Sequence, residues 1–324
     1  MNGGISKKKK ESVSEIITCH DLGDTKEFLH MHILKRGGSI CIDQTAYLKK
    51  VLQCFRMVNA KVAATPLPEG YHLLPSTDTV NTTLCTQYQQ IIGSLMYIML
   101  GTCLDIAYAV TKMAQHAVNP SQDQLNHALH ICHYLAGTSQ YALVYSGHSN
   151  KGLFACADSD WTSNPVDCRS TTEYMIKLAD GIFSWNSRAQ RTVALSSTEA
   201  EYMSLSDTSR QLVWIKALLS ELSINLGPIP LCGDNQGSIF MASNPVQECR
   251  IKHIDIRYHY IWEVVRQRQI KLYFINGADN PADMFTKNLG RVKFTQFRST
   301  LGLEIYSSQN TSNTSTDVQS AGEC

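Results

Sequence analysis

The clearest periodic pattern in the chain is a helical stripe within residues 196–222. Steps of four and three residues from Glu201 reach side chains that are almost all apolar: Leu205, Thr208, Leu212, Ile215, Leu219 and Leu222. Such a stripe predicts an amphipathic helix whose apolar face packs on a sheet. Because Glu201 begins the stripe, the pattern also places a carboxylate at the end of a buried face, where it needs a partner.

The first half of the chain predicts a mainly helical region that follows a short hairpin. Residues 25–43 read as two strands joined at Gly37 and Gly38, and residues 44–57 carry an apolar helical stripe. Beyond a connector rich in Pro, Gly, Ser and Thr, two longer helical stretches follow, the first of them interrupted near Gly101.

From about residue 140 the pattern changes to strands. A hairpin turning at Asp180 and Gly181 precedes the striped helix. The other elements expected are strands at 141–147, 151–161, 230–235 and 270–276, and helices at 236–243, 251–269 and from 280. This order predicts an α/β fold with a mixed five-stranded sheet and helices on both faces. We expect three parts: residues 1–140, residues 141–303, and a polar, disordered tail at 304–324.

Composition narrows the class of protein. The net charge of +1 provides no overall basic field, so any contact with nucleic acid must use local patches. The eleven cysteines include no C-x-x-C pair, which favours free thiols in a reducing compartment over a disulfide framework or a zinc module. The chain shows no secretory signal and no long apolar run, so we expect a cytoplasmic or nuclear location and no membrane partner.

Three further acids fall at the ends of neighbouring elements. Asp158 lies in a strand with apolar residues on both faces, Asp234 ends a short strand, and Asp283 lies at the start of a helix. Carboxylate oxygens suit Mg²⁺ or Mn²⁺ rather than Zn²⁺. Together with Glu201, these acids predict a site for two such ions, about 3.5–4 Å apart as in two-metal nucleases.

Each of these acids also has a structural role open to it. Glu199 and Glu201 both lie three residues after a Ser or Thr, which is the spacing of a capping box. The two aspartates beside helix starts can simply favour the helix dipole. Asp160 shares a strand face with Asp158, so spacing does not choose between them.

The motifs ADSDW, SSTEAEY, CGDNQGSI, IKHIDIRYHYI and NPADMFTK closely resemble the ribonuclease H domain of copia-type LTR retrotransposon Pol polyproteins, over about residues 150–303. The resemblance implies the ribonuclease H fold and cleavage of the RNA strand of RNA–DNA hybrids with two Mg²⁺ ions, for which Mn²⁺ can substitute. The catalytic and metal-binding acids of the family fall on Asp158, Glu201, Asp234 and Asp283. Asp160 also matches the family pattern.

The first half resembles the thumb and connection region of the same polyproteins, in stretches such as DLGDTKEFLHMHI and YQQIIGSLMYIMLGTCLDIAYAV. Cys103 and His133 stand where the family usually has arginine, which predicts weaker contact with a nucleic-acid backbone. The polymerase Tyr-x-Asp-Asp motif is absent. We therefore expect no reverse transcriptase activity, and the upstream Pol regions as partners within the parent element.

A basic segment supplies the residues expected to bind the hybrid. Arg250, Lys252, His253 and Arg257 alternate with apolar residues, as they would if one helix face packs and the other meets phosphates. A merely solvated face fits the same pattern. A structural histidine is the alternative for His253, and also for the nearby His259.

The sequence leads to a metal-dependent endoribonuclease that acts on RNA–DNA hybrids. One alternative is a catalytically inactive, nucleic-acid-binding remnant of a retroelement, which the altered first half favours. The other is an integrase-like strand-transfer enzyme with the same fold. Its last acid normally belongs to a later helix, whereas here the helix after the third strand carries Glu201.

Overall fold

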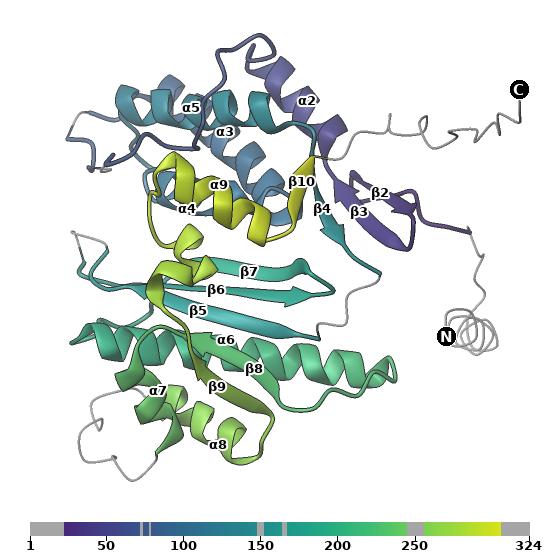
Figure 1. Ribbon diagram of the computed structural model, residues 1–324. Coiled ribbons are helices and arrows are strands. Elements are labelled where there is room, and N and C mark those ends of the chain that lie inside the picture. The colour runs from purple at the N-terminus through teal and green to yellow at the C-terminus, as the bar shows by residue number, and fades with distance from the viewer. Residues whose placement is uncertain are drawn as a thin grey trace, which may run out of the picture.

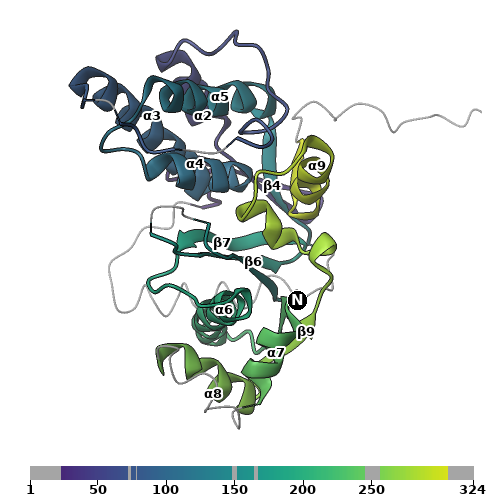
Figure 2. The same cartoon turned by 90° about the vertical axis from the view of Figure 1, so that its left-hand side faces the viewer.

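The computed structural model describes residues 23–71, 74–77, 79–147, 152–163, 167–244 and 256–305, the side chains of 256 and 257 excepted. Within these ranges the chain forms two five-stranded sheets with helices packed around them (Figure 1; Figure 2 gives the view at 90°). None of the described helices combines the length and the apolar character that crossing a membrane requires.

The first sheet is antiparallel, in the order β1-β2-β3-β4-β10. Its strands are β1 (Glu27–Phe28), β2 (Met31–Arg36), β3 (Ser39–Asp43), β4 (Tyr141–Tyr145) and β10 (Leu303–Ile305). As predicted, β2 and β3 form a hairpin that turns at Gly37 and Gly38, where both residues have positive φ. The helices of the first half are α2 (Thr45–Cys54), α3 (Thr82–Gly101), η1 (Leu104–Ile106), α4 (Ala107–Ala114) and α5 (Gln122–Thr138).

The second sheet is mixed, in the order β7-β6-β5-β8-β9. Its strands are β5 (Phe154–Asp160), β6 (Thr171–Leu178), β7 (Gly181–Ala189), β8 (Ile229–Gly233) and β9 (Ile270–Phe274). The first three strands pair antiparallel, whereas β8 and β9 run parallel to β5. The prediction of a mixed five-stranded sheet preceded by a mainly helical region is confirmed.

One face of the second sheet is covered by α6 (Ser197–Glu221), with α7 (Gln236–Ser243), η3 (Ile256–His259) and α8 (Tyr260–Arg266) beside it (Figure 1). The predicted stripe is buried from Leu205 to Leu219 against Ala155 and Ala157 of β5. Leu222 departs from the prediction and is 47% exposed, because α6 ends one residue before it.

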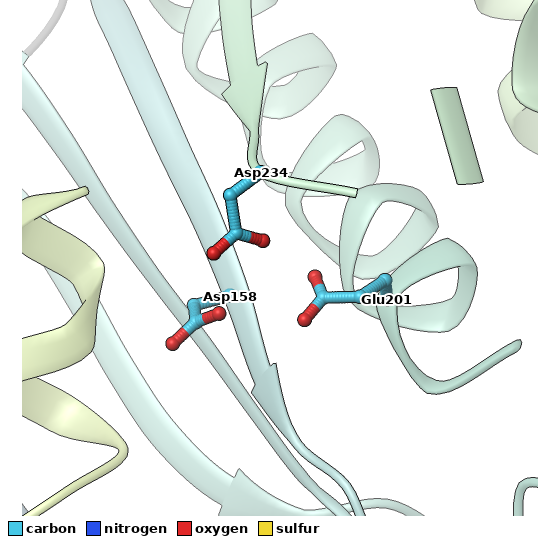
Figure 3. A group of neighbouring side chains, drawn as sticks. All are labelled: Asp158, Glu201 and Asp234. Carbon is cyan, nitrogen blue, oxygen red and sulfur yellow. The ribbon is translucent and has the colours of Figure 1, made fainter. Parts of the chain in front are cut away.

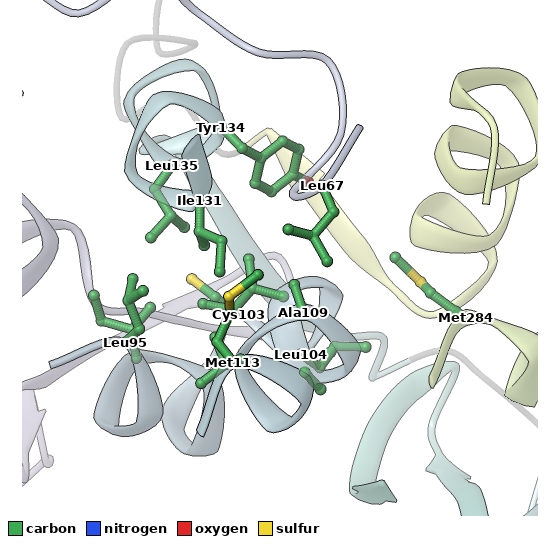
Figure 4. Packing of buried hydrophobic residues seen from close by; sticks show 14 of the residues in the cluster. Leu67, Leu95, Cys103, Leu104, Ala109, Met113, Ile131, Tyr134, Leu135 and Met284 are labelled. Carbon is green, nitrogen blue, oxygen red and sulfur yellow. The ribbon is translucent and has the colours of Figure 1, made fainter. Parts of the chain in front are cut away.

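The opposite face of the second sheet packs against the first half of the chain. Cys156 of β5 and Met175 of β6 belong to the same core as Ile131 of α5 and Leu104 of η1. Met284 enters this core from η5 (Pro281–Phe285), as Figure 4 shows. The last helix, α9 (Arg291–Thr300), buries Phe294 and Phe297 there as well. One continuous core therefore joins the first half to the sheet that carries the candidate site.

Two local predictions for the strands need correction. Tyr141–Tyr145 is a strand as expected, but it pairs with β3 and β10 in the first sheet. The hairpin turns at Ala179 and Asp180, one residue earlier than predicted, with φ of 53° and 62°. Gly181 is the first residue of β7, and a Cβ there would lie 2.7 Å from the carbonyl oxygen of Val144. The glycine therefore serves close packing on β4. The division of the chain at residue 140 stays a proposal.

The C-terminal region also differs from the sequence prediction. The helix expected from residue 280 is the short 3₁₀ helix η5, followed by the separate helix α9. Glu304 and Ile305, the first two residues of the predicted tail, lie in β10, and residues 306–324 lie outside the described ranges. The helix predicted at 251–269 is described only from residue 256, where η3 leads into α8.

Candidate metal centre

Three of the predicted acids meet at one end of the second sheet. Asp158 comes from the central strand β5, Glu201 from the first turns of α6, and Asp234 from the residue after β8. One carboxylate oxygen of each lies within 4.8 Å of the others. Figure 3 shows the three side chains and the elements that they come from. Because β5 and β8 are adjacent and parallel, their carboxyl ends deliver both aspartates to the same edge.

The two glutamates at the start of α6 make different contacts. Ser196 caps the helix by accepting a hydrogen bond from the backbone N–H of Glu199. The Glu199 carboxylate accepts in turn from the backbone N–H of Leu195, at 2.9 Å. Glu201 faces the sheet instead, and its Oε1 accepts from the backbone N–H of Ser159, at 3.1 Å. The capping role belongs to Glu199, which leaves the Glu201 carboxylate at the cluster.

Asp283 is brought close to β5 by its own helix start. Asn280 caps η5 by accepting from the backbone N–H of Ala282, and its Nδ2 donates to the carbonyl oxygen of Ala157 in β5, at 3.0 Å. The Asp283 carboxylate is buried, yet it is not part of the three-acid group. Its Oδ1 lies 2.7 Å from Nζ of Lys287 and its Oδ2 lies 2.6 Å from Nζ of Lys293.

Crowding of buried carboxyl groups changes their acidity. Burial, followed by the nearby carboxyl of Asp283, raises the pKa of Asp158 to about 7. Burial, followed by the charges of Asp158 and Asp234, raises the pKa of Glu201 to about 9. Burial also raises the pKa of Asp234. For Asp283, burial acts in the same direction, but its interactions with Asp158 and the two lysines outweigh it and lower the pKa.

The cluster fits a hard divalent cation. Oδ2 of Asp158 and Oε2 of Glu201 are buried and accept no hydrogen bond from any residue in the described ranges. The nearest ammonium group to Asp158 is that of Lys287, at 3.9 Å from Oδ2. Buried carboxylate oxygens without donors are costly unless a cation binds them or a proton neutralises them. Three oxygen ligands from three elements are the donor set that Mg²⁺ and Mn²⁺ favour.

Two features of the centre were missed from the sequence. Lys287 follows Asp283 by four residues, a spacing that signals an ion pair on a helix and was available to sequence reasoning. Glu173 lies directly opposite Asp158 in the β5–β6 ladder, is fully buried, and has no hydrogen-bond partner for either oxygen among the described residues. Only the strand register places it there. Burial, followed by the charge of Asp158, raises its pKa well above the usual range.

Of the other candidate residues, the structure describes the side chains of Asp160 and His259, and neither belongs to the three-acid group. Asp160 is on the same strand face as Asp158, two residues further along β5, and is half-buried. Arg250, Lys252 and His253 lie outside the described residues, as does the side chain of Arg257. His259 is structural in its contacts, because its Nδ1 is 2.9 Å from the hydroxyl of the buried Tyr202.

Cys103 and His133, which stand where the family usually has arginine, lie in different surroundings. Cys103 is buried in the shared core, so a charged side chain would have no place there without rearrangement. His133 is on α5, and its Nδ1 lies 2.8 Å from the carbonyl oxygen of Lys61. The small, uncharged side chain of Cys103 therefore fits the core in which it lies.

Comparison with known proteins identifies the family. The chain is 34% identical over 309 residues to the Retrovirus-related Pol polyprotein from transposon TNT 1-94 of Nicotiana tabacum, covering 93% of this chain and 23% of that polyprotein. It is 33% identical over 295 residues to the corresponding polyprotein from transposon RE1 of Arabidopsis thaliana, covering 90% and 20% respectively. No family model matches the chain. The chain belongs to the copia-type retrotransposon Pol polyproteins and spans about a fifth of the length of these relatives.

Among solved structures, ribonuclease H1 from the halophilic archaeon Halobacterium salinarum NRC-1 is 14% identical, with a TM-score of 0.26. The alignment covers 41% of this chain and 91% of the ribonuclease. The family membership rests on the polyproteins.

Proposed function

We propose that the chain is a metal-dependent endoribonuclease that cleaves the RNA strand of RNA–DNA hybrids, leaving 5′-phosphate and 3′-hydroxyl ends. The observation that carries the proposal is the convergence of Asp158, Glu201 and Asp234 within 4.8 Å, from three separate elements. Family membership supports the proposal, since these three acids lie in the sequence motifs that resemble the ribonuclease H region of such polyproteins. Asp283 is proposed as the fourth acid.

The residues of the site would have separate roles in binding the ions and in positioning the carboxylates. Asp158, Glu201 and Asp234 would hold the first of two Mg²⁺ ions, and Asp283 with Asp158 the second; bound ions would polarise the scissile phosphate and an attacking water. The backbone N–H of Ser159 orients the Glu201 carboxylate toward this position. Asn280 fixes η5 to β5, and thereby holds Asp283 beside Asp158.

Substrate binding is proposed for the basic segment 250–257, with Arg250, Lys252, His253 and Arg257 contacting the hybrid backbone. The proposal includes no polymerase activity, since the chain contains no Asp-Asp dipeptide. A cytoplasmic or nuclear site of action agrees with an RNA–DNA hybrid as substrate.

The deciding experiment compares Glu201→Gln with wild type on an RNA–DNA hybrid labelled at the RNA 5′ end, with Mg²⁺. Glu199→Gln is the matched control, because Glu199 caps the same helix two residues away. Loss of residues that only orient metal ligands typically costs about 10- to 100-fold in activity, so loss of the ligand itself should cost more than about a hundredfold. The Glu199→Gln variant should cleave at close to the wild-type rate.

Two outcomes contradict the proposal. Equal cleavage by wild type and Glu201→Gln would show that the acid cluster does not take part in the reaction. A wild-type chain that binds the hybrid but leaves it intact with both Mg²⁺ and Mn²⁺ would favour the alternative, a catalytically inactive nucleic-acid-binding remnant.

A further inference from the structure

The Asp283 carboxylate is already fully paired within the chain. Each of its two oxygens contacts a different lysine, Oδ1 with Lys287 at 2.7 Å and Oδ2 with Lys293 at 2.6 Å. The Asp283 side chain is only 4% exposed, so its carboxylate makes both contacts in a buried setting. An ion that used Asp283 as a ligand would have to replace one of them.

Lys287 also approaches a second acid of the cluster. Its Nζ lies 3.9 Å from Oδ2 of Asp158, so one ammonium group lies close to both Asp158 and Asp283. These are the two carboxylates that the proposed function assigns to the second ion. A lysine cation and a divalent ion cannot share the space between them, because their charges repel at such short range.

The net charge of the cluster also favours one divalent ion in the presence of both lysines. If Asp158, Glu201, Asp234 and Asp283 are ionised and the fully buried Glu173 keeps its proton, the four carboxylates with Lys287 and Lys293 carry a net charge of −2. One divalent ion balances that charge. Two ions would leave these groups with two excess positive charges, and withdrawal of one lysine halves that excess.

The two lysines differ in how firmly they are held. Lys293 belongs to α9, whose Phe294 and Phe297 are buried in the shared core, and its Nζ lies 5.1 Å from the centre of the Phe297 ring. Lys287 follows η5 and is the more exposed of the two, at 49% against 37%. Lys287 is therefore the cation that can move toward solvent while Lys293 keeps Asp283 in place.

We propose that Lys287 occupies the position of the second divalent ion in the ion-free protein, and that it must withdraw from Asp158 and Asp283 before a second ion is held there. The inference rests on the proposed function and assigns Lys287 as a positioning residue for it. After withdrawal, the ammonium group is available to a phosphate of the RNA backbone. The three-acid group keeps its own ion without any movement of the lysines.

The test measures ion binding to the full chain without nucleic acid, by calorimetric titration with Mg²⁺ and with Mn²⁺. The wild type should bind one ion, and a second one much more weakly. Lys287→Met removes the charge but keeps the length of the side chain, and should strengthen binding of the second ion about tenfold, a change of about 1.4 kcal/mol. Lys287→Arg, which keeps the charge, and Lys50→Met, an exposed lysine on α2, should both behave as wild type.

The titrations separate this inference from the proposed function. A first ion bound by wild type, with an unchanged or weaker second ion in Lys287→Met, overturns the inference alone. Failure of the wild type to bind any ion overturns both. If Lys287→Met does not fold, the wild type still decides: in a ¹³C-dimethyllysine NMR spectrum, the Lys287 resonance should shift with the second ion and not with the first. A Lys287 resonance unmoved at saturating ion concentrations overturns the inference.

Discussion

Tyr134 donates its hydroxyl hydrogen to Oδ2 of Asp105, and both side chains are buried between the two halves of the molecule. Arg298 of α9 completes the network, donating to the Tyr134 hydroxyl at 3.0 Å and to the Tyr141 hydroxyl at 2.8 Å. The network ties α9 to η1 and α5 of the first half. Burial raises the pKa of Asp105, and the hydrogen bond from Tyr134 opposes that rise.

Tyr134→Phe should therefore destabilise the whole chain. The substitution leaves a buried carboxyl of Asp105 without its side-chain donor, which costs about 1–3 kcal/mol in the free energy of unfolding. Tyr141→Phe removes a hydroxyl from the same Arg298 in a half-buried position, and should cost about 1 kcal/mol or less. Urea denaturation of both variants measures the difference, and equal costs would contradict the prediction.

The two halves should unfold together because they share one core. Ile131→Ala creates a cavity in α5 and should lower the free energy of unfolding by about 2–5 kcal/mol. All four tryptophans lie in the second half, so their fluorescence reports on that half alone. The prediction is that the fluorescence transition shifts with the mutation in the first half. Val118→Ala, at an exposed position in the same half, is the control. An unmoved fluorescence transition in Ile131→Ala would show that the halves are independent.

Stability of the ion-free chain should fall as pH rises. Burial raises the pKa of Glu201 from 4.5 to about 9, so the folded chain keeps a proton that the unfolded chain loses. The stabilisation is complete below the unfolded pKa and is lost as pH rises through about 9. Glu201→Gln stays neutral, so its stability advantage over wild type in EDTA should grow steadily between pH 5 and pH 9. Unfolding curves measured from pH 5 to 9 that run parallel for the two proteins would be the opposite result.

Gly277 should matter for ion binding through Asp234. A Cβ at residue 277 would lie 2.8 Å from Oδ2 of Asp234, so an alanine forces the carboxylate to turn. Gly277→Ala should weaken Mg²⁺ binding about tenfold, equivalent to about 1.4 kcal/mol. Gly93→Ala has no atom near its added Cβ and lies within α3, so it should leave ion binding unchanged. Isothermal titration of the two variants distinguishes a local effect from a general effect of replacing glycine.

Local periodicity in the sequence was sufficient to predict the elements that carry much of the site. The stripe that starts at Glu201 predicted both α6 and its buried face, because a helix repeats every 3.6 residues. Asp158 and Asp234 could be placed at strand ends for the same kind of reason, since period and turn signals are local. The capping spacing allowed either glutamate of α6. The structure gives that role to Glu199, whose carboxylate binds the backbone N–H of Leu195.

Tertiary structure alone decided which groups share the cluster and which surfaces meet. Strand register sets Glu173 opposite Asp158, and packing of α9 on the first half brings Lys293 to Asp283, ten residues away in sequence. Pairing with β3 and β10 places Tyr141–Tyr145 in the first sheet, and Gly181 allows β7 to pack closely on this strand. These contacts depend on how whole elements pack. A sequence pattern records which face of an element is apolar, but not which of several apolar faces will cover it.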